Sequence, residues 1–228
     1  MAEYFLYTHS GDREELEKAV RKEIQIACEP RPIHTVLAQL EPVRLIITSN
    51  YDTLMEQELN KYNRLLTRHV YNAANPRTGH FDHSPFLEEN EVLLHKMHGT
   101  VEEPGSLVIT QSDYIRYLAN LHDVDRGMPE YFRKTMLPHF TLLFLGYSLE
   151  DWNFHVIWDG VLSGYASQHL RRNAYALVKD PSHMQVKYWA RRNVDVFDQD
   201  LTEFAVQLAE HFNLEIPLRG IFKKGDAL

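Results

Sequence analysis

Apolar and polar positions along the chain follow two spacings, which predict helices and strands in alternation. Residues 12–27 place apolar side chains on one helical face and charged side chains on the other, as an amphipathic helix does. The same spacing predicts further helices at 34–40, 53–62, 150–163, 182–193 and 202–212, and one that begins near 112. Apolar runs predict strands at 43–49, 91–98, 107–110, 140–146, 174–179 and 194–197. This order predicts an α/β fold, a Rossmann-like, open and mostly parallel sheet with helices on both faces.

Three further local patterns add to this prediction. The run at 140–146 is almost continuously apolar, which is typical of a strand buried on both of its faces. Residues 71–90 are rich in Asn, His and Pro, and we expect a long loop there with at most short strands. Asp52 is a suitable N-cap for the helix that follows it.

Polar residues follow three of the predicted strands. They are Asn50, Tyr51 and Asp52 after the first strand, His98 and Gly99 after the second, and Gly146, Tyr147 and Ser148 after 140–146. In an open α/β sheet, ligands bind beyond the carboxyl ends of the strands. Each set alone is also common in turns and helix caps. Their position at three strand ends predicts that they converge on one pocket.

Composition limits the classes of function. A chain of 228 residues with 44% hydrophobic and 25% charged residues suits one globular α/β domain, expected over 1–219, with 220–228 as a tail. The net charge of −8 argues against a dedicated nucleic-acid-binding protein. No apolar run is long enough to cross a membrane, and no secretory signal is recognisable, so we expect a cytoplasmic protein.

Metal binding and thiol chemistry find little support in the residue pattern. The single cysteine, Cys28, excludes an internal disulfide and a zinc site built from several cysteines. His80, Asp82 and His83 lie close together in sequence, but the chain has no H-E-x-x-H or comparable ligand pattern. We interpret 80–84 as a solvated loop, and we expect neither a metal ion nor a thiol nucleophile.

Three segments together resemble the sirtuin-like family. They are "ITSNYDTLMEQEL", "LLHKMHGTVEEPGSLVITQSDYIRYL" and "LLFLGYSLEDWNF", within a resemblance that runs from about Ala2 to Phe212. The branch resembled is the divergent, zinc-free bacterial one, found in antiphage defence proteins that hydrolyse NAD. The resemblance implies that NAD is the substrate and that no metal is needed. It also implies an NAD+ glycohydrolase, which releases nicotinamide and ADP-ribose.

The resemblance also implies roles for individual residues. Asn50 and His98 match the essential asparagine and the catalytic histidine of the family. The remaining matches are to NAD-binding positions, namely Ser49, Tyr51, Asp52, Gly99, Gly146, Tyr147, Ser148 and Asp151. Nicotinamide leaves as a neutral molecule, so the reaction needs no general acid, and a pocket that orients the ribose and a nucleophile is sufficient. An imidazole with an ordinary pKa near ~6.5 can accept a proton from water or a ribose hydroxyl.

One departure from the family leaves three interpretations open. The family begins with a strand and a glycine-rich phosphate-binding loop, whereas none of the ten glycines here forms a Gly-x-Gly motif. The chain is a fragment of a longer protein, or a partner or fused domain supplies the missing strand and regulation, or the protein is a degenerate relative. In the family this strand is interior, so we expect unpaired strand edges where nothing fills the gap.

Two other functions compete with NAD hydrolysis. Protein deacylation is disfavoured because the zinc ribbon of many deacylases needs four cysteines. A catalytically degenerate module that binds NAD or ADP-ribose, or that forms homo-oligomers, agrees with the missing phosphate loop. The sequence does not identify a partner protein, an oligomeric state or an activating signal.

Overall fold

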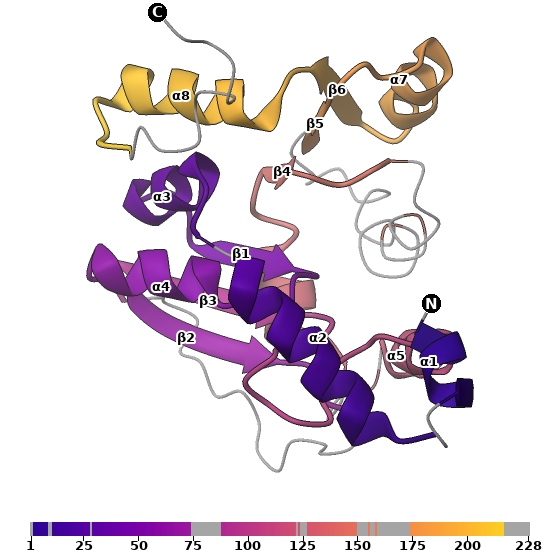
Figure 1. Cartoon of the computed structure of the whole chain (residues 1–228). Coiled ribbons are helices and arrows are strands. Elements are labelled where there is room, and N and C mark those ends of the chain that lie inside the picture. The colour runs from indigo at the N-terminus through magenta and orange to yellow at the C-terminus, as the bar shows by residue number, and fades with distance from the viewer. Residues whose placement is uncertain are drawn as a thin grey trace, which may run out of the picture. The chain divides into compact units, whose positions relative to one another are not determined.

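The computed structural model describes most of the chain as two compact units (Figure 1). The described residues are 2–8, 11–27, 29–73, 88–121, 123, 127–149, 155, 158 and 174–216. Unit 1 comprises Met1–Pro30 and Leu37–Pro129, and unit 2 comprises Arg31–Val36 and Glu130–Leu228. The chain passes between the units just before helix α3 (Pro32–Gln39), within α3, and after Pro129, and each unit is described by itself.

Unit 1 contains a parallel three-stranded sheet in the order β1-β3-β2. The strands are β1 (Leu45–Thr48), β2 (Leu65–Val70) and β3 (Glu91–Lys96). Helix α4 (Leu54–Lys61) connects β1 to β2, as a crossover between parallel strands requires. In register, Thr48 of β1 and Val70 of β2 both lie opposite Lys96 of β3. All three strands therefore end at the same edge of the sheet.

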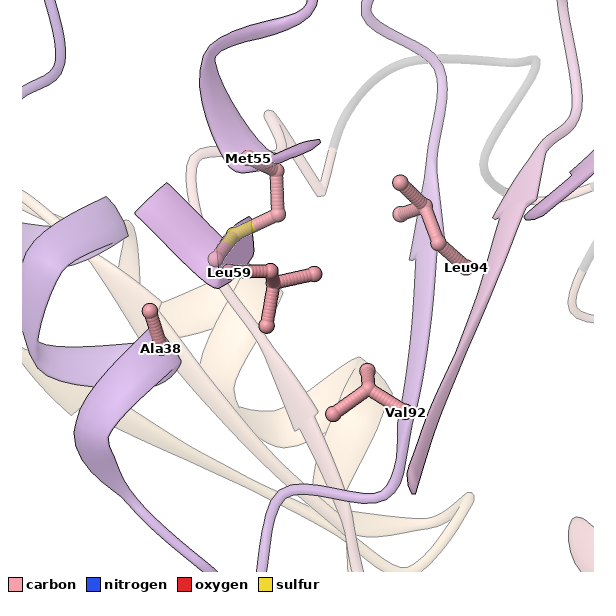
Figure 2. Packing of buried hydrophobic residues seen from close by; sticks show 5 residues of the cluster. All are labelled: Ala38, Met55, Leu59, Val92 and Leu94. Carbon is pink, nitrogen blue, oxygen red and sulfur yellow. The ribbon is translucent and has the colours of Figure 1, made fainter. Parts of the chain in front are cut away.

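The core of unit 1 lies between α4 and one face of this sheet. Figure 2 shows Met55 and Leu59 of α4 beside Val92 and Leu94 of β3, which project toward the helix. Leu59, Val92 and Leu94 are completely buried, and Ala38 from the end of α3 completes the cluster. Strand alternation places Lys96 on the same face as these two β3 residues.

Strand β2 is an element that the hydrophobic pattern did not predict. Its sequence, LLTRHV, interrupts the apolar run with charged residues, and its strand character depends on pairing with β3. Arg64, just before the strand, is buried and donates hydrogen bonds to the carbonyl groups of Ala38, Leu40, Val43 and Asn90. Such contacts join distant segments, so local periodicity does not reveal them.

The other helices of unit 1 are α1 (Ala2–Thr8), α2 (Arg13–Ala27) and α5 (Gln111–Asn120). The sequence predicted α2 and α5 but not α1. The strand predicted at 107–110 is wrong, because these residues form no strand pairing in the structure. Instead, Thr110 caps α5 in a reciprocal capping box with Asp113.

Unit 2 contains a second parallel sheet in the order β4-β5-β6. Its strands are β4 (Leu142–Phe144), β5 (Ala174–Val178) and β6 (Val194–Asp198). Helix α7 (His183–Ala190) connects β5 to β6, and α8 (Leu201–Phe212) follows β6. A π-helical turn, η1 (Phe132–Met136), precedes β4. The parallel sheets with connecting helices confirm the predicted Rossmann-like α/β class.

Strands β1 and β4 both lie at the edges of their sheets, and β4 also differs from the expected burial. Strand β4 is not buried on both faces, since Leu143 is 42% exposed at the edge of its sheet. Within the part of the chain that the structure describes, β1 and β4 each pair on one side only. Both of these edge strands are apolar, and whether another strand pairs with them stays a prediction. The predicted helix at 150–163 lies mostly outside the described residues.

Candidate functional site

Two of the predicted strand ends lie at one edge of the sheet in unit 1. Asn50 follows Thr48 by two residues, His98 follows Lys96 by two residues, and Thr48 and Lys96 are opposite each other in register. Ser49 is half-buried, and Asn50 is exposed. The structure therefore brings the ends of β1 and β3, with both predicted catalytic residues, to the same edge.

The turn at Asn50, Tyr51 and Asp52 is held by hydrogen bonds at each of its residues. The backbone N–H of Asn50 donates to Oγ1 of Thr48 at 3.1 Å. Oδ1 of Asp52 accepts a bond from the backbone N–H of Leu54 at 3.0 Å, so this side chain caps the start of α4 one position before Thr53. We refer to residues 50–52 as the Asn50 turn.

Tyr51 connects the Asn50 turn to the loop after β3. Its backbone carbonyl accepts a bond from the N–H of Val101 at 3.0 Å, and its hydroxyl donates to the carbonyl of Val108 at 2.5 Å. Burial raises the pKa of the Tyr51 hydroxyl, and the Asp113 carboxylate raises it further, against an opposing effect of Arg13. The hydroxyl therefore remains a hydrogen-bond donor at neutral pH.

His98 lies half-buried between the sheet and α5. Its ring makes edge-on contacts with Tyr114 and Tyr117, with ring centroids 5.3 and 5.1 Å apart. Its backbone carbonyl accepts a bond from the N–H of Val108 at 3.0 Å. Val108 thus bonds to His98 through its N–H and to Tyr51 through its carbonyl, so one residue joins the two strand ends.

Gly99 permits a close approach of backbone to backbone. Its φ is +84°, and a Cβ at this position would lie 2.2 Å from the carbonyl oxygen of Ser106. Ser106 also accepts a bond from the N–H of Thr100 through its hydroxyl at 3.0 Å. The nearby backbone of Ser106 is therefore sufficient reason for a glycine at this position.

A charged network fixes the segment that carries Val108. Arg13 of α2 donates to Oδ2 of Asp113 and to the carbonyl of Leu107, both at 2.5 Å, and to Glu17 at 2.9 Å. Burial lowers the pKa of Arg13, but its bonds to Asp113 and Glu17 outweigh this effect and raise it overall. Burial raises the pKa of the Asp113 carboxyl, but bonds from the backbone N–H of Thr110, from Arg13 and from the N–H of Ile109 hold it below its usual value.

A buried ion pair lies beneath the Asn50 turn, and sequence reasoning missed it. Lys96 is 1% exposed, and its Nζ lies 3.3 Å from Oε1 of Glu56 in the first turn of α4. The same ammonium donates a hydrogen bond to the backbone carbonyl of Asp52. A lysine inside the apolar run of β3 was the available sequence signal.

The third predicted strand end belongs to unit 2. Gly146 has a φ of +71°, Tyr147 is half-buried and Ser148 is exposed. Asp151 lies outside the described residues. Nearby, the ring of His155 contacts the carbonyl of Leu149 at 3.0 Å through Nε2 and the hydroxyl of Tyr188 at 3.2 Å through Nδ1. The predicted convergence of Gly146, Tyr147 and Ser148 with the other two strand ends stays a prediction.

The structure does not describe the segment that the sequence suggested for metal binding. His80, Asp82 and His83 lie outside the described residues. In the described part of the chain, no three His, Cys, Asp or Glu side chains are arranged to hold a metal ion.

Among the described helices, none has the length and hydrophobicity that a membrane span needs.

The fold and the polar strand ends define an α/β protein with a candidate ligand site at the carboxyl ends of parallel strands. A family model described as a SIR2-like domain matches residues 44–197. The match covers more than half of the chain, and the chain belongs to this family. The predicted sirtuin-like membership is thereby confirmed.

Several curated proteins are similar over much of the chain. The NAD(+) hydrolase ThsA of Bacillus cereus (strain MSX-D12) is 25% identical over 214 residues, which cover 91% of this chain and 41% of that protein. The NAD(+) hydrolase ThsA of Acinetobacter baumannii (strain 532279) is 27% identical over 157 residues, or 69% of this chain and 30% of that protein. The protein of that name from Enterococcus faecium is 27% identical over 160 residues, with the same coverage. The chain therefore spans less than half the length of these relatives.

Proposed function

We propose that this chain carries an NAD+ glycohydrolase site, with Asn50 and His98 as its catalytic residues. The observation that supports it best is that both residues follow neighbouring strands at one sheet edge, in loops joined through Val108. Membership of the SIR2-like family and similarity to proteins named NAD(+) hydrolase support the same reaction.

The proposed reaction replaces the bond between C1′ of the ribose and the nicotinamide nitrogen by a bond to water. The electron pair of the broken bond goes to nicotinamide, which leaves as a neutral molecule, and positive charge develops on the ribose. The amide of Asn50 orients the ribose hydroxyls or the water. The imidazole of His98 accepts the proton that water loses, and ADP-ribose is the second product.

The remaining predicted residues are proposed to bind the substrate. Ser49, Tyr51, Asp52 and Gly99 would shape the pocket for the nicotinamide ribose, and all four lie at the ends of β1 and β3. Gly146, Tyr147, Ser148 and Asp151 would contact the adenosine half. Antiphage defence, a partner that supplies a strand and self-association are proposals that rest on the family resemblance alone.

Nicotinamide release from NAD by the purified protein tests this proposal. We expect turnover by the wild type and a loss of at least about 100-fold in kcat for Asn50→Ala and for His98→Ala. Asn60→Ala and His139→Ala are matched controls, because both side chains are exposed and lie outside the proposed site. Full activity in Asn50→Ala or His98→Ala would exclude the assigned catalytic role.

A second candidate function is binding of NAD or ADP-ribose without hydrolysis. This sequence has no Gly-x-Gly motif, and without the backbone N–H groups of such a turn the pyrophosphate would be placed less well for hydrolysis. Titration calorimetry with NAD and with ADP-ribose distinguishes the two functions. Saturable binding of NAD without nicotinamide release would support the binding module and contradict the hydrolase.

A further inference from the structure

The ammonium group of Lys96 occupies an unusual position for a lysine. It is 1% exposed within a strand whose six residues are all buried, on the face that carries Val92 and Leu94. Removing an ammonium group from water is costly, and well-packed apolar residues often serve as well or better in such positions. Stability of the core therefore does not by itself account for a lysine here.

The contacts of Lys96 are directed at the Asn50 turn. Its Nζ donates to the backbone carbonyl of Asp52 and lies 3.3 Å from Oε1 of Glu56. Through these two contacts, one ammonium group ties the Asn50 turn and the first turn of α4 to β3. The attachment point is two residues before His98, so the end of β3 carries the group that holds the turn and leads directly to the proposed base.

A second cation lies beside the same carboxylate oxygen of Glu56. Nη1 of Arg68 in β2 lies 3.6 Å from Oε1 of Glu56, and the same guanidinium pairs with Glu102 and, at 3.8 Å, with Glu103. Glu102 and Glu103 belong to the loop that follows His98 and Gly99. The charges thus form a continuous chain from the Asn50 turn through α4 and β2 to the loop after β3.

We propose that Lys96, together with Glu56, is a positioning residue that fixes the Asn50 turn relative to His98. The inference rests on the proposed NAD hydrolysis. Lys96 touches neither the reacting atoms nor, as proposed, the substrate. It acts by holding the carbonyl of Asp52, and thereby the backbone that carries the Asn50 side chain.

Two variants separate positioning from simple charge balance. Lys96→Met removes the ammonium group but leaves the Glu56 carboxylate buried beside Arg68. Lys96→Met combined with Glu56→Gln also removes that carboxylate, so the double variant lacks the bond to Asp52 without a buried unpaired charge. Lys61→Met is the matched control, because Lys61 makes a comparable contact of 3.5 Å with Glu58 of the same helix but is 56% exposed.

Hydrogen exchange and steady-state kinetics are measured together on the full chain. In the double variant we expect the amides of peptides covering residues 50–54 and 99–101 to exchange at least about tenfold faster, because the bonds at Leu54 and Val101 depend on the turn. We expect kcat for NAD to fall by about 10- to 100-fold with a smaller change in KM. The melting temperature should lie closer to that of the wild type than the melting temperature of Lys96→Met does.

The outcomes decide each proposal separately. Wild-type exchange rates at 50–54 in the double variant would overturn the positioning role, and so would faster exchange accompanied by an unchanged kcat. If the wild type does not release nicotinamide, the proposed reaction fails, while the exchange rates still decide whether Lys96 holds the turn. Exchange accelerated equally by Lys61→Met would also overturn the proposal, because the effect would then belong to any lysine contact on α4.

Discussion

The hydroxyl of Tyr51 donates a hydrogen bond of 2.5 Å to the backbone carbonyl of Val108, 57 residues away in sequence. The N–H of Val108 in turn donates to the carbonyl of His98. The turn after β1 and the end of β3 are therefore connected by one residue of an irregular segment. The stability of this segment governs how well Asn50 and His98 are held near the same edge.

Tyr51→Phe should loosen this connection. The substitution keeps the ring but leaves the carbonyl of Val108 without the hydroxyl, and we expect a loss of about 1–2 kcal/mol in the free energy of unfolding. Urea denaturation followed by circular dichroism measures it. Tyr7→Phe, at a side chain that is 94% exposed, is the control and should change the free energy little. Equal stability of Tyr51→Phe and wild type would contradict the importance of the bond.

Gly99→Ala should be far more damaging than Gly105→Ala. Both glycines have positive φ, at +84° and +79°, so each alanine incurs a similar backbone strain of about 1–2 kcal/mol. Only at Gly99 does the new Cβ meet another atom, the carbonyl oxygen of Ser106 at 2.2 Å, whereas Gly105 has open space. Thermal unfolding of the two variants compares them. Equal melting temperatures would show that residues 99–106 relax without cost.

Acid should remove the contribution of Asp113 to stability. Hydrogen bonds from backbone N–H groups and Arg13 hold its pKa below the usual value despite burial, so the folded protein binds fewer protons here than the unfolded chain. The contribution is present above the unfolded pKa of about 3.9 and is lost as pH falls through the lower folded pKa.

Asp113→Asn tests this pH dependence. The variant should be less stable than wild type by about 1–2 kcal/mol near pH 7, and the difference should shrink below about pH 4. Urea denaturation across this pH range measures it. Asp195→Asn, at an exposed residue of β6, provides the control. A difference between Asp113→Asn and wild type that is independent of pH would contradict an ionic contribution.

In unit 2, Asp200 should stabilise the start of α8. Its Oδ1 accepts bonds from the backbone N–H groups of Thr202 and Glu203 at 2.8 and 3.4 Å, and these bonds hold the pKa of the carboxyl below its usual value. Asp200→Ala should cost about 1 kcal/mol, whereas Asp200→Asn keeps an acceptor and should cost less. Chemical denaturation of the two variants compares their losses in free energy of unfolding. An equal loss in both would argue against the capping role.

Much of the fold could be predicted from sequence because its signals are local. Apolar runs identified the strands at 45–48, 91–96, 174–178 and 194–198, and helical spacing identified α2, α4 and α5. Polar residues at strand ends identified Asn50 and His98 as candidates. The family resemblance then attached a reaction to them, and the family model confirms the resemblance.

Two misplaced elements show what local signals lack. Residues 65–70 form β2 although Arg68 and His69 interrupt the apolar pattern, because pairing with β3 satisfies their backbone. Residues 107–110 look like a strand but instead bond to His98 and Tyr51 across the ends of two other strands. In both cases the partner lies far away in sequence.

The sequence by itself determined where most of the described helices and strands form, which family the chain resembles and which polar residues follow the strands. Only the tertiary structure decided that Lys96 is buried against Glu56, and that Arg13 fixes Asp113 across 100 residues. The spacing of apolar positions depends only on residues that are near one another in sequence. The burial and pairing of charges depend instead on which distant segments pack together. Burying a charge is costly unless an opposite charge and hydrogen bonds compensate for the lost hydration.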